Sequence, residues 1–328
     1  MVTLDMIRYP VAEDLKLFEQ MVHENFSEHD TPMSEMLDYA LSSRGKGVRP
    51  TLVLLSAALN SAVGSGGKRA ALAGMLIEMI HVASLIHDDV IDDAATRRGK
   101  ASLNARWQSR NAIVAGDYIL ARTMAIGMKS GQYDLVQHII GAITTLCEGE
   151  VLQSRHAAQM DTTRQDYLDI IYRKTASLLS ISASAGALAA GASRERVETM
   201  RRYGEAIGMA FQIQDDILDY TACDSITGKP SHNDLREGKI TLPLIAVMEQ
   251  SDEEERKRLR ELLSRCKDDD EAINQLHEVV ISHDGTLSAA RTMHAYLSKA
   301  AALLADYEPS PVRDALINLC AFVGERDR

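Results

Sequence analysis

Runs in which apolar and polar residues alternate, the pattern of a half-buried β-strand, are nearly absent from this chain. Helix-forming residues are abundant instead, and residues 167–179 and 253–263 have the composition of helices. No proline lies between Pro50 and Pro230, and because proline disrupts helix interiors, this interval favours long helices. The pattern predicts helices over residues 12–26, 33–43, 50–62, 68–93, 101–107, 111–130, 133–156, 164–190, 194–220, 240–250, 253–265, 269–282, 285–305 and 310–325.

Two segments interrupt the helical pattern: the glycine-rich residues 64–67 and the polar residues 221–239. Composition does not shift as it would at a linker, and no repeat of 20–50 residues is present. Residues 1–328 are therefore predicted to form a single all-α domain, built as one large helical bundle. The longest stretch without charge, residues 175–193, is rich in Ala, Gly and Ser, which favours close helix packing over a membrane span.

Composition narrows the class of protein. The chain has 328 residues, 45% of them hydrophobic, and a net charge of −11. This apolar content excludes a disordered chain, and the acidic charge is a poor match for a nucleic-acid binder. The cysteines have no CxxC spacing, which predicts reduced thiols rather than disulfides or structural zinc. Because the first twenty residues lack the apolar core of a signal peptide, we expect a soluble cytoplasmic protein with no transmembrane segment.

The strongest chemical signal is an acidic motif that occurs twice, at Asp88, Asp89 and Asp92 and again at Asp215, Asp216 and Asp219. On a helix the first and fifth positions lie about 40° apart and the second and fifth about 60°, so each motif is predicted to place three carboxylates on one face. Such like charges on an apolar helix need a cation, and oxygen-only ligands favour Mg²⁺ that also binds substrate phosphates. The alternative is a solvated acidic face, and the duplication of the motif weighs against it.

Basic residues that could bind those phosphates lie near both motifs and in a glycine-containing loop. A loop that leads into a helix offers an anion backbone donors as well as side chains. Each residue taken alone could equally be a surface cation. The candidates are Lys46 and Arg49 in residues 44–50, Arg97 and Arg98 after the first motif, Lys174 beside Thr175 in an apolar helix, and Lys229 and Lys239 in the long segment after the second motif.

His81 lies seven residues before Asp88, which is two helical turns, so the two side chains share a face. A single histidine on an apolar helix is more often a satisfied core residue than a ligand. Glu78 and His81 also have the ExxH spacing of a di-iron bundle. That architecture needs a second ExxH and two further glutamates, which we do not find in the sequence.

In combination, the motifs make the sequence resemble the trans-isoprenyl diphosphate synthases of the polyprenyl synthetase family over nearly its whole length. Besides the two aspartate-rich motifs, the chain has further sets of residues typical of the family: Arg97-Arg98-Gly99, Gly116-Asp117-Tyr118, Glu148-Gly149-Glu150, Lys174-Thr175, Thr227-Gly228-Lys229 and Gly238-Lys239. The family's GGKRxRP loop appears as RGKGVRP at residues 44–50, so Arg44 and Gly47 depart from the family pattern. The resemblance implies a helical bundle of the isoprenoid synthase type around a central cavity, and a homodimer, although a heterodimer stays open.

The resemblance also implies a mechanism of ionisation, condensation and elimination, in which isopentenyl diphosphate attacks an allylic cation. It implies three Mg²⁺ ions held by Asp88, Asp92 and Asp215, with Asp89, Asp216 and Asp219 nearby. It places the allylic diphosphate against Arg97, Lys174, Lys229 and Lys239, and isopentenyl diphosphate against Lys46, Arg49, His81 and Arg98. Thr175 and Gln212 are expected near the cation, where oxygen dipoles stabilise positive charge.

Product length in this family depends on a tunnel beside the helix that precedes the first motif. Short-chain members commonly carry a bulky aromatic residue four or five positions before that motif, where this chain has Ala83 and Ser84. The next turn offers Met79 and Ile80. An isoprene unit of about 5 Å matches the ~5.4 Å rise of a helical turn, so the ~27 Å of helix over residues 70–88 would serve roughly five condensations.

We therefore predict a product of about C30–C40, the length made by hexa- to octaprenyl diphosphate synthases. A block at Met79, or at Met124 or Met128 on a facing helix, would stop growth near C20. A geranylgeranyl or farnesyl diphosphate synthase would keep the same chemistry with a shorter product.

Other functions share some of these features. A class I terpene cyclase has the all-α fold and the first motif, but its second metal motif usually has an Asn/Ser/Glu pattern and it needs no second diphosphate site. A non-catalytic subunit of a heteromeric prenyl synthase normally loses the aspartate motifs. Since both motifs are intact here, this chain would be the catalytic member of such a pair.

Overall fold

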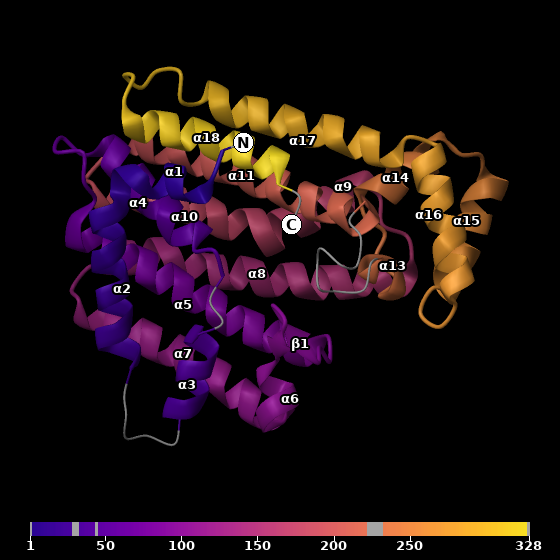
Figure 1. Cartoon of the computed structure of the whole chain (residues 1–328), viewed down its shortest axis with the longest axis horizontal. Coiled ribbons are helices and arrows are strands. Elements are labelled where there is room, and N and C mark those ends of the chain that lie inside the picture. Colours follow the sequence, from indigo (N-terminus) through magenta and orange to yellow (C-terminus); the bar gives the residue numbers. More distant parts are fainter. Residues whose placement is uncertain (1, 28–32, 43–44, 222–231, 327–328) are drawn as a thin grey trace.

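The computed structural model describes residues 2–27, 33–42, 45–221 and 232–326, and helices make up nearly all of them (Figure 1). The helices are α1 (Leu4–Arg8), α2 (Ala12–Phe26), α3 (Ser34–Ser42), α4 (Val48–Asn60), α5 (Gly67–Ile91), α6 (Leu103–Trp107), α7 (Ser109–Lys129), α8 (Tyr133–Gln159), α9 (Arg164–Ile171), α10 (Ser177–Ala189), α11 (Arg194–Thr221), α13 (Asn233–Arg236), α14 (Leu242–Gln250), α15 (Glu253–Arg265), α16 (Asp270–Ser282), α17 (Gly285–Ala302) and α18 (Pro311–Glu325). The predicted all-α class is confirmed.

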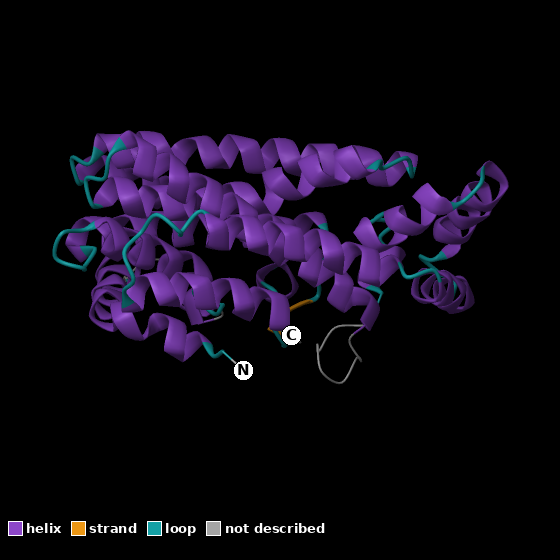
Figure 2. Cartoon of the chain, turned by 90° about the horizontal axis from the view of Figure 1, so that it is seen from above, coloured by secondary structure: helices purple, strands orange, loops and turns teal. Residues whose placement is uncertain are grey.

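The core is built around α5, α10 and α11. Most residues of α5 from Ala70 to Ile86 are buried, which is typical of a helix surrounded by other helices. It packs against α2, α4 and α7, while α10 packs against α4 and α11, and α11 against α17 and α18. Figure 2 shows helices nearly throughout, with one small hairpin as the only strands in the described part of the chain.

Small residues bring α4, α10 and α11 unusually close together. A Cβ atom at Gly186 of α10 would lie 2.2 Å from the Val53 carbonyl oxygen of α4, and one at Gly204 of α11 would lie 2.3 Å from the Leu179 carbonyl oxygen of α10. Neither helix pair could keep this spacing with a larger residue. The predicted close packing of residues 175–193 is confirmed.

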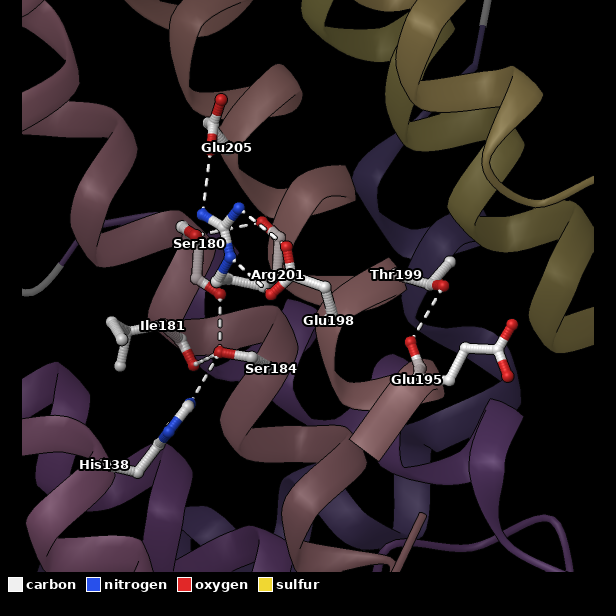
Figure 3. A network of polar contacts seen from close by, with 9 residues as sticks. All are labelled: His138, Ser180, Ile181, Ser184, Glu195, Glu198, Thr199, Arg201 and Glu205. Atoms are coloured by element: carbon white, nitrogen blue, oxygen red, sulfur yellow. Dashed lines mark hydrogen bonds and ion pairs between the residues drawn. The ribbon is translucent and has the colours of Figure 1, made fainter. Parts of the chain in front are cut away.

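A polar network fastens α10 between α8 and α11 (Figure 3). The His138 Nε2 atom of α8 lies 2.7 Å from the Ser184 hydroxyl, which donates to the Ser180 carbonyl oxygen. The Ser180 hydroxyl in turn donates to the Arg201 carbonyl oxygen of α11 at 2.9 Å. Burial lowers the pKa of His138, so this network is held by a neutral imidazole at pH 7.

The predicted helix over residues 164–190 is wrong in one respect, because a π-helical turn divides it. α9 ends at Ile171, residues Tyr172–Ala176 form the π turn, and α10 begins at Ser177. A π turn inserts one extra residue into a helix and often marks a functional site. This turn carries Lys174 and Thr175, and it contains no proline or glycine that would have disclosed it in the sequence.

Several smaller elements were also missed. The chain begins with α1 and a 3-10 turn at Tyr9–Val11, and α13 lies inside the segment predicted to be a loop. The predicted helix over residues 101–107 begins only at Leu103, since strands β1 (Thr96–Arg97) and β2 (Lys100–Ala101) form a hairpin before it. The two residues at the turn of this hairpin, Arg98 and Gly99, both have positive φ angles, of 53° and 75°, as a type I′ turn requires.

Two helices, α5 and α8, are long and apolar enough to cross a membrane by length and composition alone. The most apolar stretch of α5 is 78% buried inside the bundle, which identifies it as a core helix. The corresponding stretch of α8 is only 28% buried, so α8 presents apolar side chains at the surface.

The close approach of α10 and α11 predicts that Gly204→Ala destabilises the fold by about 1–3 kcal/mol, because the added methyl group has no space. Lys257→Ala, at an exposed position of α15, is the control and should change the free energy of unfolding by less than about 0.5 kcal/mol. Urea denaturation measures both, and equal midpoints for Gly204→Ala and the parent protein would contradict the packing argument.

Candidate active site

A central cavity of ≈ 480 Å³ collects most of the predicted site residues. Its walls come from α4, α5, the π turn, α11 and the C-terminal end of α18. The predicted residues that line it are Lys46, Arg49, His81, Ser84, Asp88, Arg97, Arg98, Lys174, Thr175, Gln212 and Asp215. An adjoining cavity of ≈ 170 Å³ shares Lys174, Thr175 and Gln212, and adds Asp216 and Lys239. Lys229 lies outside the described residues.

The first aspartate motif faces two adjoining cavities. Asp88 lines the central cavity, and burial raises its pKa to about 6, although the Lys174 ammonium opposes the shift. Asp92 caps the helix, and burial raises its pKa as well. Asp89 is buried beside a smaller cavity that shares Arg97 and Arg98 with the central one, and it accepts a 2.8 Å hydrogen bond from the Arg97 Nε atom. Asp89 therefore positions Arg97, and the expectation of three carboxylates on one face stays a prediction.

The second motif divides in a similar way. Asp215 lines the central cavity. Asp216 accepts hydrogen bonds from the Tyr167 hydroxyl at 2.6 Å and the Gln212 amide at 2.9 Å, and burial raises its pKa to about 7. Asp219 accepts from the Asn233 and Asp234 backbone N–H groups, both at 3.1 Å, and so anchors α13.

The cations beside these aspartates each have a carboxylate partner already. The Lys174 Nζ atom lies 2.5 Å from Glu150, Lys239 forms an ion pair with Glu237, and Arg97 forms one with Asp89. These partners hold the long side chains near the cavity and balance their charge. Glu150 belongs to the Glu148-Gly149-Glu150 motif, so its importance could be seen in the sequence, whereas its pairing with Lys174 could not.

A chain of hydrogen bonds orients the polar groups beside the π turn. The Thr175 hydroxyl donates to Gln212 Oε1 at 2.7 Å, and the Gln212 amide nitrogen donates to Asp216. The Tyr167 hydroxyl donates to the other Asp216 oxygen. Because the Thr175 hydroxyl proton is used toward Gln212, the Thr175 oxygen presents its lone pairs to its surroundings. Tyr167 was not predicted, since only the fold brings α9 beside α11.

The second group of basic residues forms a separate part of the cavity wall. Arg49 is half-buried, and burial lowers its pKa, with the Glu78 carboxylate as the largest opposing charge. The pKa of His81 lies well below its usual range because of burial and the nearby Arg49 and Arg98 guanidinium groups, so His81 is neutral at pH 7. Glu78, whose spacing to His81 had only suggested half of a di-iron motif, is a buried carboxylate that balances the charge of Arg49.

The unpredicted α1 supports the loop that carries Lys46. Arg8 donates to the Lys46 carbonyl oxygen and, at 3.2 Å, to the Thr51 hydroxyl. Thr51 also donates to the Gly47 carbonyl oxygen at 2.7 Å. Gly47 has a φ angle of +56°, which favours glycine and accommodates its departure from the family pattern. Arg8 and Thr51 therefore hold the backbone of this loop in place through their hydrogen bonds.

An apolar groove of ≈ 480 Å³ continues from the central cavity, with which it shares Ser84, Asp88 and Leu146. Residues from three helices line it, including Ile80 and Ala83 of α5, Ile113 and Leu120 of α7, and Ile143 and Cys147 of α8. Three of the four predicted chain-length residues thus lie in this groove.

The fourth chain-length residue, Met79, is fully buried and is not part of the groove lining, and neither are Met124 and Met128. On the N-terminal side of Ile80, residues 70–79 of α5 are buried against other helices. The part of the expected wall that borders this groove begins at Ile80, and the wall over residues 70–79 stays a prediction.

Among the described residues, no three His, Cys, Asp or Glu side chains are grouped closely enough to hold a metal ion by themselves. Asp88 and Asp215 line the same cavity from different helices, so a ligand between them would have to complete the coordination. Carboxylate oxygens are hard ligands that suit Mg²⁺. The donor set therefore fits a hard divalent ion that arrives together with an anion.

Comparisons with known proteins agree with this geometry. Residues 30–280 match the family model for polyprenyl synthetase. A short chain isoprenyl diphosphate synthase of Methanothermobacter thermautotrophicus is 32% identical over 97% of this chain and 99% of its own, and heptaprenyl diphosphate synthase component 2 of Geobacillus stearothermophilus is 34% identical over 97% of each. A polyprenyl synthase from Caulobacter crescentus, complexed with calcium and isoprenyl diphosphate, has a TM-score of 0.91 at 27% identity, over 100% of this chain and 99% of its own.

Proposed function

Because this chain belongs to the polyprenyl synthetase family, we propose that it is a Mg²⁺-dependent trans-polyprenyl diphosphate synthase with a product of about C30–C40. It would condense isopentenyl diphosphate with an allylic diphosphate. The observation that carries the proposal is a single cavity with two separate basic groups, acidic side chains between them and an apolar groove leading away. A terpene cyclase would need neither the second basic group nor the groove.

Asp88, Asp92 and Asp215 would hold the divalent ions, which we take to be three Mg²⁺. The ions would supply charge neutralisation of the diphosphate leaving group. Their coordination would be completed by the diphosphate itself, in keeping with the separation of the two motifs. The buried Asp89 and Asp216 and the half-buried Asp219 then act indirectly, by positioning Arg97, Gln212 and α13.

Arg97, Lys174 and Lys239 would bind the allylic diphosphate and stabilise the negative charge that develops as its carbon–oxygen bond breaks. Their carboxylate partners keep them in place before the substrate arrives. The Thr175 and Gln212 oxygens would face the resulting allylic cation, with Thr175 held by its bond to Gln212. The π turn supports this assignment, since it brings Lys174 and Thr175 to the same cavity from consecutive positions.

Lys46, Arg49 and Arg98 would bind the diphosphate of isopentenyl diphosphate, with neutral His81 donating a hydrogen bond. The double bond between C3 and C4 would then attack the cation, forming one carbon–carbon bond. A proton leaves C2 to restore the double bond, and the released diphosphate would accept it.

Product length would be set by the apolar groove. On α5 the groove extends from Ile80 to Ile91, which is ~17 Å of helix and room for roughly three isoprene units along that wall. A longer chain would continue between α7 and α8, where the groove is open. Small side chains at Ala83 and Ser84 leave its entrance unobstructed.

The proposed activity is tested with purified protein, Mg²⁺, labelled isopentenyl diphosphate and each of the dimethylallyl, geranyl, farnesyl and geranylgeranyl diphosphates. Sizing of the dephosphorylated products should show a ladder that ends at about C30–C40. A stop at C15–C20 would keep the chemistry and contradict the length. Release of hydrocarbon from an allylic diphosphate alone would indicate a cyclase, and no incorporation would indicate a missing partner subunit.

Asp88→Ala is expected to lower turnover by at least about 100-fold. The substitution removes one ligand of the divalent ions that would neutralise the diphosphate leaving group. The fold should remain intact, since the substitution relieves repulsion between buried carboxylates. Initial rates and circular dichroism measure the two effects. Glu254→Ala, an exposed residue of α15, is the control and should change neither; a near-normal rate for Asp88→Ala would contradict the metal assignment.

Ala83→Phe should shorten the product to about C15–C20, because a phenyl ring would fill the groove within two turns of Asp88. Product sizing after complete conversion measures the change. Ala302→Phe adds the same ring to an exposed position of α17 and should leave product length unaltered. An unchanged product with Ala83→Phe would remove Ala83 from the tunnel.

We infer a homodimer in which α7 and α8 form the interface. Both helices expose large apolar side chains, among them Ile113 and Val114 on α7 and Ile140 and Val151 on α8. Apolar surface of this kind on neighbouring helices is typical of a protein interface. A partner there would also cover the open side of the groove. The relative named component 2 keeps a heterodimer with a different chain as the alternative.

Ile140→Glu should convert the dimer into a monomer, since it places a charge on this apolar face at a residue that is 46% exposed in the single chain. Sedimentation velocity measures the change. Val63→Glu, at an exposed position in the loop between α4 and α5, should remain dimeric. A monomeric parent protein would favour the heterodimer, and a dimeric Ile140→Glu would place the interface elsewhere.

We place the protein in the cytoplasm, where its cysteines would stay reduced. Cys147, Cys266 and Cys320 are free thiols in the described part of the chain. The net charge of −11 argues against a nucleic-acid partner. An insoluble polyprenyl product would bring transient contact with a membrane during release.

A further inference from the structure

Arg326, which directly follows α18, binds one of the two aspartates that line the central cavity. Its Nη2 atom lies 2.6 Å from Asp215 Oδ1 and donates to the Phe211 carbonyl oxygen, also at 2.6 Å. The guanidinium carbon stacks 3.7 Å from the centre of the Phe211 ring. The Gln214 amide donates to the Arg326 carbonyl oxygen at 2.9 Å, so side chain and backbone are both fastened to one turn of α11.

The arginine side of this contact is buried, while the Asp215 side chain remains 44% exposed. The Arg326 side chain is only 9% exposed and lines the central cavity with Lys46 and Arg49. Its Nε atom is buried and has no hydrogen-bond partner among the described residues. A charged bond in such surroundings is stronger than one at the surface, because water screens it less.

The other two proposed metal ligands are in a different situation. Neither Asp88 nor Asp92 has an ion-pair partner within 4 Å in the described part of the chain. The nearby lysines are bound to Glu150 and Glu237 instead. A divalent ion can therefore reach the first motif without displacing a cation, whereas at Asp215 it meets one.

We propose that Arg326 is the internal counter-ion of Asp215 in the metal-free enzyme, and that a divalent ion binds Asp215 only by displacing its guanidinium group. The inference rests on the proposed function, in which Asp215 is a metal ligand. A guanidinium and a divalent ion cannot share one carboxylate oxygen without strong repulsion. Arg326 is thus a positioning residue that keeps Asp215 oriented and lowers the affinity of the metal ion bound there.

The test measures Mn²⁺ binding to the full chain by electron paramagnetic resonance of the free ion, at low ionic strength with saturating inorganic diphosphate. Asp215→Asn identifies the ion that depends on Asp215. Arg326→Gln should tighten the binding of that ion by roughly 10- to 100-fold and leave the remaining ions unchanged, since a charged hydrogen bond no longer competes. Arg326→Lys, which keeps the charge but loses the fork and much of the stacking, should tighten it less.

A second readout separates this role from a purely structural one. Without metal, Arg326→Gln should melt below the parent protein, and the difference should shrink at saturating Mn²⁺ with diphosphate, because the parent protein has then also lost the contact. Arg313→Gln is the matched control. Arg313 lies in the first turn of α18, and its side chain donates to the Leu304 carbonyl oxygen, away from the cavity lining, so the substitution should leave Mn²⁺ affinity unchanged.

Unchanged or weaker Mn²⁺ binding in both Arg326 variants, with prenyl transfer by the parent protein intact, would overturn this inference alone. An Asp215→Asn protein that binds as many ions as the parent would overturn it together with the metal assignment. Prenyl transfer itself is measured independently, so the two failures are distinguishable.

Discussion

The dominant constraint in this molecule is the burial of carboxylates around one cavity. Asp88 and Asp216 have pKa values raised to about 6 and 7 because burial disfavours their charged forms. Two buried aspartates have partners within the fold: Asp89 accepts a hydrogen bond from Arg97, and Asp216 accepts one from the Tyr167 hydroxyl. What remains uncompensated faces the cavity. The site is thus a concentration of unfavourable charge that the rest of the bundle keeps in place and a ligand can relieve.

Rigid packing makes such a site possible. The helices that carry the second motif and the π turn approach each other so closely that backbone and glycine are in contact, as at Gly204 and Leu179. A polar network through His138 and Ser184 ties the same helices to α8. Repelling carboxylates on a looser scaffold would separate. Here their separation would require the core to open, which is costly in a close-packed interior.

Much of this architecture could be predicted from the sequence because its signals are local. Helix periodicity, the absence of proline over a long interval and the two aspartate motifs are all visible in short windows. The features that were missed depend on tertiary contacts instead. Nothing within Tyr172–Ala176 marks a π turn, and no local pattern pairs Tyr167 with Asp216 or brings Arg326 to Asp215. Periodicity also does not tell which face of α5 meets a groove, so the sequence could not distinguish Met79 from Ile80 and Ala83, which line one.

The groove and the close-packed core have unequal tolerance to change, and this bears on how such enzymes diverge. Enlarging a residue between α10 and α11 is expected to destabilise the fold, so few substitutions are tolerated at that contact. Apolar residues of α5, α7 and α8 that line the groove, such as Ala83 and Leu120, have open space beside them. If the groove holds the growing chain as proposed, single substitutions there would change product length while the chemistry at the carboxylates is inherited unaltered.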